Sequence, residues 1–137
     1  MGARRTGRVI AFQTVFSWEA NDITTEELLK FEWLDPDEPQ NSQTAVDFAR
    51  LLAAGTVENI HIIDKTIKEH LVNWKFNRLS KVDLAILRIS VYSLLYRDEI
   101  PQKVTIDEAV DIAKSYGNDE SYKFVNGVLD SIRKKNE

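Results

Sequence analysis

The sequence contains no cysteine, two histidines, three prolines and five widely spaced glycines among its 137 residues. The lack of cysteine excludes disulfide bonds and thiolate chemistry and fits a reducing compartment, so we expect a cytoplasmic protein. The dispersed glycines exclude a glycine-rich phosphate-binding loop. No apolar run is long enough to cross a bilayer, so we expect no membrane span.

Catalytic and metal-binding groupings are missing as well. Glu58 and His61 form one E-x-x-H motif, whereas a di-iron helical bundle needs that motif twice together with further glutamates. A solvated helix face is therefore the simpler interpretation of this pair. No spacing indicates a Ser-His-Asp triad, and we expect a protein that is not an enzyme and that uses no metal or cofactor.

What the sequence does contain is helical periodicity. Apolar residues recur at helical spacing and no segment alternates as a strand would, so we predict an all-α fold. The length suits one domain, residues 1–137. The predicted helices cover residues 4–20, a short stretch after Thr24, residues 44–71 with Gly55 as the candidate break, residues 81–96, residues 105–116 and a last helix from Asn118 or Asp119.

Two sequence patterns mark helix starts. Ser80 and Asp83 match a capping box before "KVDLAILRISVYSLLY", which is apolar almost all round and therefore predicts a central, buried helix. Thr105 and Glu108 match a second capping box, and Gly117 is a natural end for the helix that follows.

The dipeptide Asn126-Gly127 is typical of a tight β-hairpin turn. It nevertheless lies inside a helical stripe formed by Val125, Val128 and Leu129. A mid-helix glycine costs about 1 kcal/mol relative to alanine, so we expect another backbone or a partner to approach closely at Gly127. Asn126 is expected to be a polar group satisfied between helices.

Charge is unevenly distributed along this chain of net charge −4. The first 18 residues hold Arg4, Arg5 and Arg8 and no acid, whereas residues 19–47 hold nine acids and one base. The three arginines share one side of the first predicted helix by their spacing. They form either a solvated first turn or a clamp for phosphates, and the residues alone do not decide between the two.

The last predicted helix offers a second candidate surface. Phe124 lies on the edge of the apolar stripe beside Lys123, in line with Glu120 and Gly127. A half-exposed phenylalanine near a lysine suits the stacking of an unpaired nucleobase. The alternative is that Phe124 only widens the core-facing side of the helix.

Three segments resemble the NusB transcription antitermination factor family: "RVIAFQTVFSWE", "LSKVDLAILRISVYSLLYRDEIPQKVTIDEAVDIAKSYG" and "DESYKFVNGVLDSI". The resemblance is dense from Ser80 to Ile132, good over residues 4–20 and weak from Phe31 to Thr44. It implies an all-helical fold of about seven helices in two packed subdomains. It also implies a non-enzymatic factor that pairs with ribosomal protein NusE and binds single-stranded boxA RNA within the RNA polymerase antitermination complex, promoting transcription of ribosomal RNA operons.

The resemblance carries specific residues onto this chain. The RNA-binding positions correspond to Arg4, Arg5, Arg8, Glu120, Lys123 and Phe124, and the NusE-binding positions correspond to Phe16 and Asp83. Two positions depart from the family pattern, because Phe16 stands where tyrosine is common and Tyr122 where histidine is often found. Any hydrogen bond from a tyrosine hydroxyl is therefore absent at Phe16.

Two alternatives stay open at this point. The chain is also similar to the NusB-like RNA-binding domain of ribosomal RNA cytosine methyltransferases, although its length leads us to expect no nucleotide-cofactor domain. A module that binds only proteins is the other alternative. The sequence does not decide whether the free protein forms a homodimer.

Overall fold

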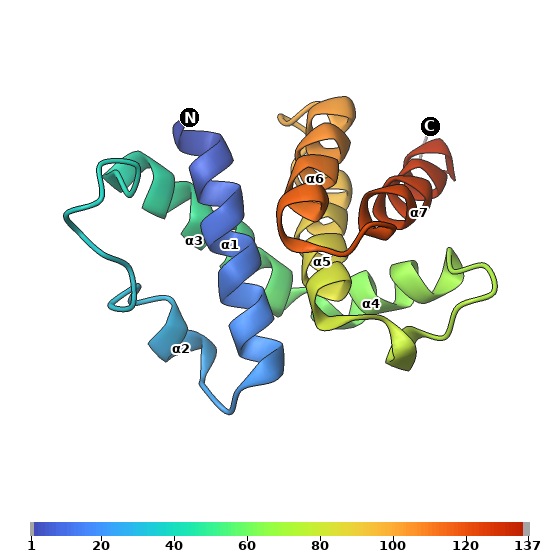
Figure 1. Cartoon of the computed structure of the whole chain (residues 1–137), viewed down its shortest axis with the longest axis horizontal. Helices are drawn as coiled ribbons and strands as arrows, with labels where there is room; N and C mark the ends of the chain where they lie inside the picture. The colour runs from blue at the N-terminus through green and yellow to red at the C-terminus, as the bar shows by residue number, and fades with distance from the viewer. Residues whose placement is uncertain (1, 136–137) are drawn as a thin grey trace.

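The computed structural model describes residues 2–135, so residues 1, 136 and 137 of the expected domain lie outside it. Within the described range the chain forms α-helices, one 3-10 helix and no strand, as the all-α prediction requires. Figure 1 shows their order along the chain. The elements are α1 (Ala3–Ala20), α2 (Thr25–Leu28), α3 (Gln43–Glu58), α4 (Ile60–Glu69), η1 (Phe76–Arg78), α5 (Lys81–Tyr96), α6 (Gln102–Tyr116) and α7 (Ser121–Lys135).

Helix α5 is the centre of the fold. It packs against α1, α3, α4, α6 and α7, and every residue from Asp83 to Leu94 is buried. The all-round apolar pattern of this helix therefore predicted its position correctly. Figure 1 shows two groups on either side of α5, with α1 to α3 on one side and α4 and α7 on the other, while α6 lies over α5 in this view.

Arg88, a buried residue of α5, links the two groups through an ion-pair network. Its guanidinium donates two hydrogen bonds of 2.9 Å to the carboxylate of Asp64 on α4 and lies 3.2 Å from the carboxylate of Glu19 on α1. Burial lowers the pKa of Arg88, but its hydrogen bonds and charge interactions with Asp64 and then Glu19 outweigh that effect and raise it. The network therefore fixes α1 and α4 on opposite sides of α5.

Two sequence-based predictions of helix boundaries are wrong. The break in the 44–71 segment occurs at Asn59 instead of Gly55, and α3 runs through Gly55 without interruption. A Cβ at Gly55 would overlap the ring of Tyr92 on α5, so this glycine serves the close packing of two helices. Helix α6 begins at Gln102 after Pro101, which places Thr105 inside the helix and removes its predicted capping role.

The remaining boundaries agree closely with the sequence pattern. Ser80 caps α5 by accepting a hydrogen bond of 3.0 Å from the backbone N–H of Asp83. Helix α6 ends at Tyr116, directly before Gly117. Asn126 and Gly127 lie inside α7, as predicted. Asn126 is exposed, however, and it forms no side-chain hydrogen bond to another described residue, so its predicted role between helices is wrong.

Candidate nucleic-acid and partner interfaces

The arginines at the start of α1 do not form one open surface. Arg5 forms ion pairs with Glu108 at 3.0 Å and with Asp111 at 3.2 Å, both on α6. The side chain of Arg5 is 48% exposed, and its hydrogen bond to Glu108 raises the pKa of the guanidinium. Its charge is therefore already balanced by two carboxylates of the protein.

Arg8 and Arg4 face α3 instead. Arg8 is only 7% exposed, and its guanidinium lies 5.2 Å from the ring centre of Phe48. Burial is the main cause that lowers the pKa of Arg8, and the nearby Glu108 opposes it. Arg4 is exposed at 5.6 Å from the same ring and forms no ion pair with another described residue. Of the three arginines, Arg4 is the most available to a phosphate.

The start of α7 holds the other predicted RNA-binding residues. The Asn118 side chain accepts a hydrogen bond of 2.9 Å from the N–H of Glu120, and Ser121 Oγ accepts one of 3.0 Å from the N–H of Asn118. These two bonds hold the turn that directly precedes α7. The structure brings Glu120, Lys123 and Phe124 together at the start of α7, with Glu120 and Lys123 exposed and Phe124 half-buried.

Phe124 has an aromatic neighbour that the sequence analysis missed. The ring of Trp74 lies 5.5 Å from the ring of Phe124, centre to centre, at an interplanar angle of 59°. Trp74 is 59% exposed. It follows Asn73, whose φ of 64° lies in the left-handed region that asparagine tolerates. The only signal in the sequence was a tryptophan in a segment without helical periodicity.

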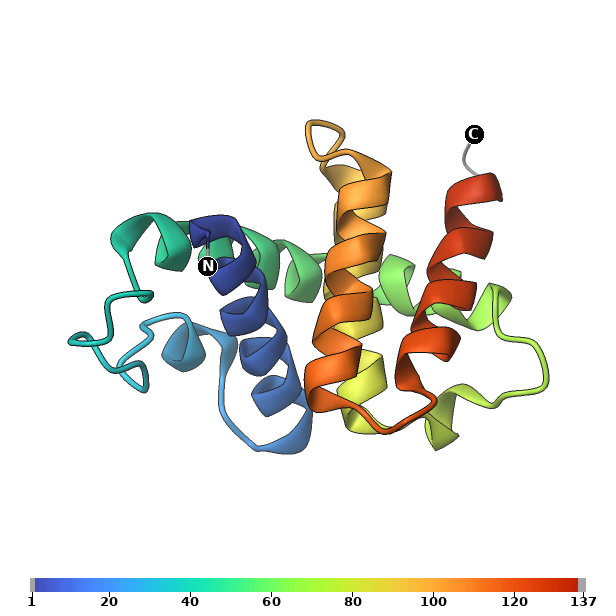
Figure 2. The same ribbon diagram turned by 45° about the horizontal axis from the view of Figure 1, so that its top comes forward.

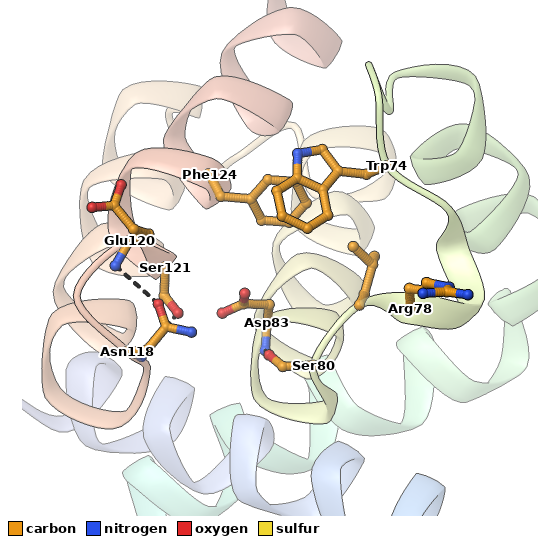
Figure 3. Close-up of a pocket in the computed structure, with 9 residues that line it drawn as sticks. Trp74, Arg78, Ser80, Asp83, Asn118, Glu120, Ser121 and Phe124 are labelled. Carbon is orange, nitrogen blue, oxygen red and sulfur yellow. Dashed lines mark hydrogen bonds between the residues drawn. The ribbon is translucent and has the colours of Figure 1, made fainter.

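A cavity of about 200 Å³ opens beneath these two rings (Figure 3). Asp83 on α5 is 8% exposed, and its Oδ1 is buried without a hydrogen-bond partner in the described residues. In Figure 3 the carboxylate points toward the space between α5 and α7. The cavity is lined by Trp74, Arg78, Leu79, Ser80, Asp83, Asn118, Glu120, Ser121 and Phe124.

Phe16, the other predicted partner-binding residue, lines a different depression. This depression has a volume of about 290 Å³ and also holds Phe12, Gln13, Ser17, Val82 and Tyr116. The Phe12 ring contacts both Phe16 and Tyr116, at centre-to-centre distances of 6.4 and 5.2 Å. Val82 directly precedes Asp83 on α5, so consecutive residues of one helix face the two depressions.

The two groups of predicted RNA-binding residues are separated in space. Helix α6 stands between the start of α1 and helix α7 in both Figure 1 and Figure 2. Arg5 lies against α6 on one side through Glu108, whereas α7 packs on α6 from the other. The structure therefore groups Glu120, Lys123 and Phe124 but does not place Arg4, Arg5 or Arg8 beside them.

Comparison with known proteins connects this arrangement to one family. A sequence model described as NusB family matches residues 5–134. The chain belongs to the NusB family. Its relatives include the transcription antitermination protein NusB of Treponema denticola, 47% identical over 96% of both chains, and that of Treponema pallidum, 50% identical over 96% of this chain and 92% of the relative.

Solved NusB structures share the fold. The chain is similar to NusB of T. maritima with a TM-score of 0.85 and 42% identity, covering 96% of this chain and 91% of that one. It is also similar to a chain in a crystal structure of antitermination factors NusB and NusE in complex with dsRNA, with a TM-score of 0.82, 27% identity and 98% of both chains covered. The family and fold predicted from the sequence motifs are confirmed.

Other functional groups are sparse in the described part of the chain. Residues 2–135 contain no group of three or more His, Cys, Asp or Glu side chains arranged to hold a metal ion. None of the helices in that range combines the length and the apolar character needed to span a bilayer.

Proposed function

We propose that this NusB family chain acts in transcription antitermination by binding boxA-type single-stranded RNA while it pairs with NusE, in support of ribosomal RNA transcription. The observation that carries the RNA part is the half-buried Phe124 presented beside exposed Lys123 on the rigid first turns of α7. Aromatic rings that can stack on bases, next to cations for the backbone, are typical of single-strand recognition. Arg4 at the start of α1 supplies a second cationic contact.

NusE is proposed to bind on the side of Phe16 and Asp83. A buried carboxylate oxygen without a hydrogen-bond partner is costly, and a cationic group from a partner would satisfy it. Asp83 Oδ1 is such an oxygen, and the apolar depression around Phe16 lies next to it along α5. A basic partner also suits a chain of net charge −4 that has to hold a polyanion.

A mobility-shift titration tests the RNA part. The wild-type protein is titrated with a boxA-type RNA, a scrambled RNA and the same boxA sequence in a duplex, with and without NusE, at two salt concentrations. We expect boxA-type single strands to bind most tightly and NusE to strengthen binding. Each lost phosphate contact flattens the log–log salt dependence by about 0.7 for single strands, so the Arg4→Ala variant should show that decrease. Equal binding of all three RNAs would contradict boxA recognition.

Asp83 variants test the NusE part. Because Ser80 caps α5 by accepting a hydrogen bond from the backbone N–H of Asp83, Asp83→Asn keeps the cap while removing the charge, and it should weaken NusE pairing. Asp83→Lys should abolish pairing. Circular dichroism shows whether the helices are retained, and normal pairing by both folded variants would contradict the assignment.

A module that binds only proteins is the second candidate. It is favoured by the burial of Arg8 and by the ion pairs that already occupy Arg5, because both observations reduce the cationic surface available to RNA. The titration separates the two functions, since RNA binding that is absent both without and with NusE supports the protein-only candidate.

A further inference from the structure

Gly127 has no structural reason to be glycine inside the protein. It lies in the middle of α7 and is exposed, and its backbone does not adopt a positive φ. A Cβ built at this position meets no heavy atom within 4 Å. Alanine would therefore fit and would stabilise the helix. The missing side chain is best explained by something outside the protein that approaches the backbone at this point.

A groove of about 300 Å³ passes over this bare stretch of helix. One wall is α7 and the other is the segment that follows α4, where Trp74 projects. The groove is lined by His70, Val72, Trp74, Lys123, Phe124, Gly127, Val128 and Ser131. None of these lining residues carries a carboxylate, whereas Asp83 and Glu120 line the neighbouring cavity on the other side of Phe124 and Trp74.

We propose that this groove binds an unpaired base of RNA, with Trp74 as a second stacking residue beside Phe124 and with Gly127 as the floor over which the base passes. The proposal rests on the proposed RNA-binding function and extends its site beyond α7. Stacking accepts any base because every base has a π-face, and Lys123 lies where it can pair with a phosphate of the same strand. The lack of a carboxylate in the groove favours RNA over a basic protein segment.

The chain provides a matched control for Trp74. Trp33 is 44% exposed, and its ring lies 5.9 Å from that of Phe31 at 51°, close to the geometry of the Trp74 and Phe124 pair. It lies in the acidic segment of residues 19–47, however, where nine acids accompany one base. A general effect of losing an exposed tryptophan should appear in both Trp33→Ala and Trp74→Ala, whereas an effect on RNA binding should appear only in Trp74→Ala.

The first experiment measures the affinity of wild type, Trp74→Ala, Trp33→Ala and Phe124→Ala for a short synthetic boxA-type RNA. Loss of one base stack corresponds to a decrease of about fivefold or more. We expect Trp74→Ala and Phe124→Ala to show this decrease and Trp33→Ala to stay within twofold of wild type by the same measure. Quenching of tryptophan fluorescence by the RNA should persist in Trp33→Phe and largely disappear in Trp74→Phe.

The second experiment uses Gly127→Ala, for which stability and binding should move in opposite directions. The melting temperature should rise by about 3 °C because helix propensity improves, while RNA affinity should fall several-fold because the methyl group occupies the floor of the groove. A variant that is more stable and binds RNA normally would show that nothing approaches Gly127.

The outcomes separate this proposal from the function on which it rests. If wild type binds none of the RNAs, the proposed function is overturned and the groove proposal with it. If RNA binding is lost in Phe124→Ala but is unchanged in Trp74→Ala and Gly127→Ala, the function stands and the groove proposal is overturned. Loss of NusE pairing in Trp74→Ala with RNA affinity unchanged identifies a protein-binding groove and also overturns it.

Discussion

Two tryptophan–phenylalanine pairs of nearly equal geometry have different surroundings in this molecule. In the first, Phe31 is 6% exposed and adopts a φ of 55°, an unusual conformation for a bulky residue. The Trp33 indole N–H donates a hydrogen bond of 3.1 Å to the carbonyl of Leu28, which ties the loop to α2. The Phe31 and Trp33 pair therefore anchors this loop to the fold.

In the second pair the left-handed position belongs to Asn73, which tolerates it, so Trp74 is carried outward without backbone strain. The indole N–H of Trp74 forms no hydrogen bond to another described residue, and its ring is open to solvent. Similar aromatic contacts can therefore occur in different structural settings. The hydrogen bond, the burial of the phenylalanine and the residue at positive φ distinguish an anchor of the fold from a surface available to a ligand.

The largest expected difference between the pairs is in stability. Phe31→Ala should cost about 3 kcal/mol of unfolding free energy because a buried ring leaves a cavity. Phe124→Ala should cost about 1 kcal/mol because its ring is half-buried, since apolar stabilisation scales with the area removed from water. Urea denaturation measures both values, and equal costs would show that the second pair is also an anchor of the fold.

The next effect concerns Arg88, whose ion pairs connect the two sides of α5 that carry these pairs. Removing Asp64 leaves a buried guanidinium with only part of its counter-charge, so Asp64→Ala should cost about 2 kcal/mol or more. Glu19→Ala is the matched variant and should cost less, because Glu19 is more exposed and makes a single contact of 3.2 Å with Arg88. Thermal or urea unfolding separates the two, and an equal loss would contradict this ranking of the partners.

A smaller effect is expected at Glu120, one helical turn before Phe124. Its exposed carboxylate should repel phosphates that pass along α7, at a cost of about 0.5 kcal/mol in water for charges about 8 Å apart. Glu120→Gln should therefore tighten RNA binding a few-fold at low salt and leave NusE pairing unchanged. Weaker binding of boxA-type RNA alone would instead indicate that Glu120 accepts a hydrogen bond from a base.

The smallest effect concerns acid stability at the end of α7. Hydrogen bonds from Arg133 and then Lys134 lower the pKa of Asp130 below its ordinary value. A carboxyl group with a lowered folded-state pKa stabilises the fold above its unfolded-state pKa, and that contribution is lost as the pH falls through the folded-state pKa. Asp130→Asn should flatten the acid limb of a plot of melting temperature against pH, with Asp119→Asn as a control.

Local features of this fold were predictable from the sequence, and long-range ones were not. The periodicity of α7 overrode the turn preference of Asn126-Gly127, and Ser80 marked the start of α5, because both depend on neighbours along the helix. Glycine is needed at position 55 because Tyr92, which lies far along the chain, packs against it. The residue type alone suggested a helix break instead. Helix α6 begins directly after Pro101, so Thr105 lies inside the helix and does not cap it.

The candidate site also combines features that the sequence predicted with features that depend on the tertiary fold. The spacing of residues on α7 placed Phe124 beside Lys123 correctly, whereas Trp74 reaches Phe124 only through the tertiary fold. The spacing of Arg4, Arg5 and Arg8 is helical as predicted, but spacing cannot show that Arg8 is covered by Phe48 or that Arg5 is held by α6. The roles of these arginines, of Phe16 and of Asp83 in binding stay predictions.

Arg5 is paired with two carboxylates of α6, so its charge also affects any polyanion that passes over that helix. A strand that contacts both Arg4 and Lys123 has to cross α6, and there it meets Glu108 and Asp111. Arg5 partly neutralises these two carboxylates as a counterion that is fixed to the protein and cannot be diluted away. Mobile salt cannot replace it fully, because dissolved ions are not held at that position. The positive charge of Arg5 thus offsets one of the two negative charges on α6, and it lowers the repulsion that a polyanion crossing this helix would meet.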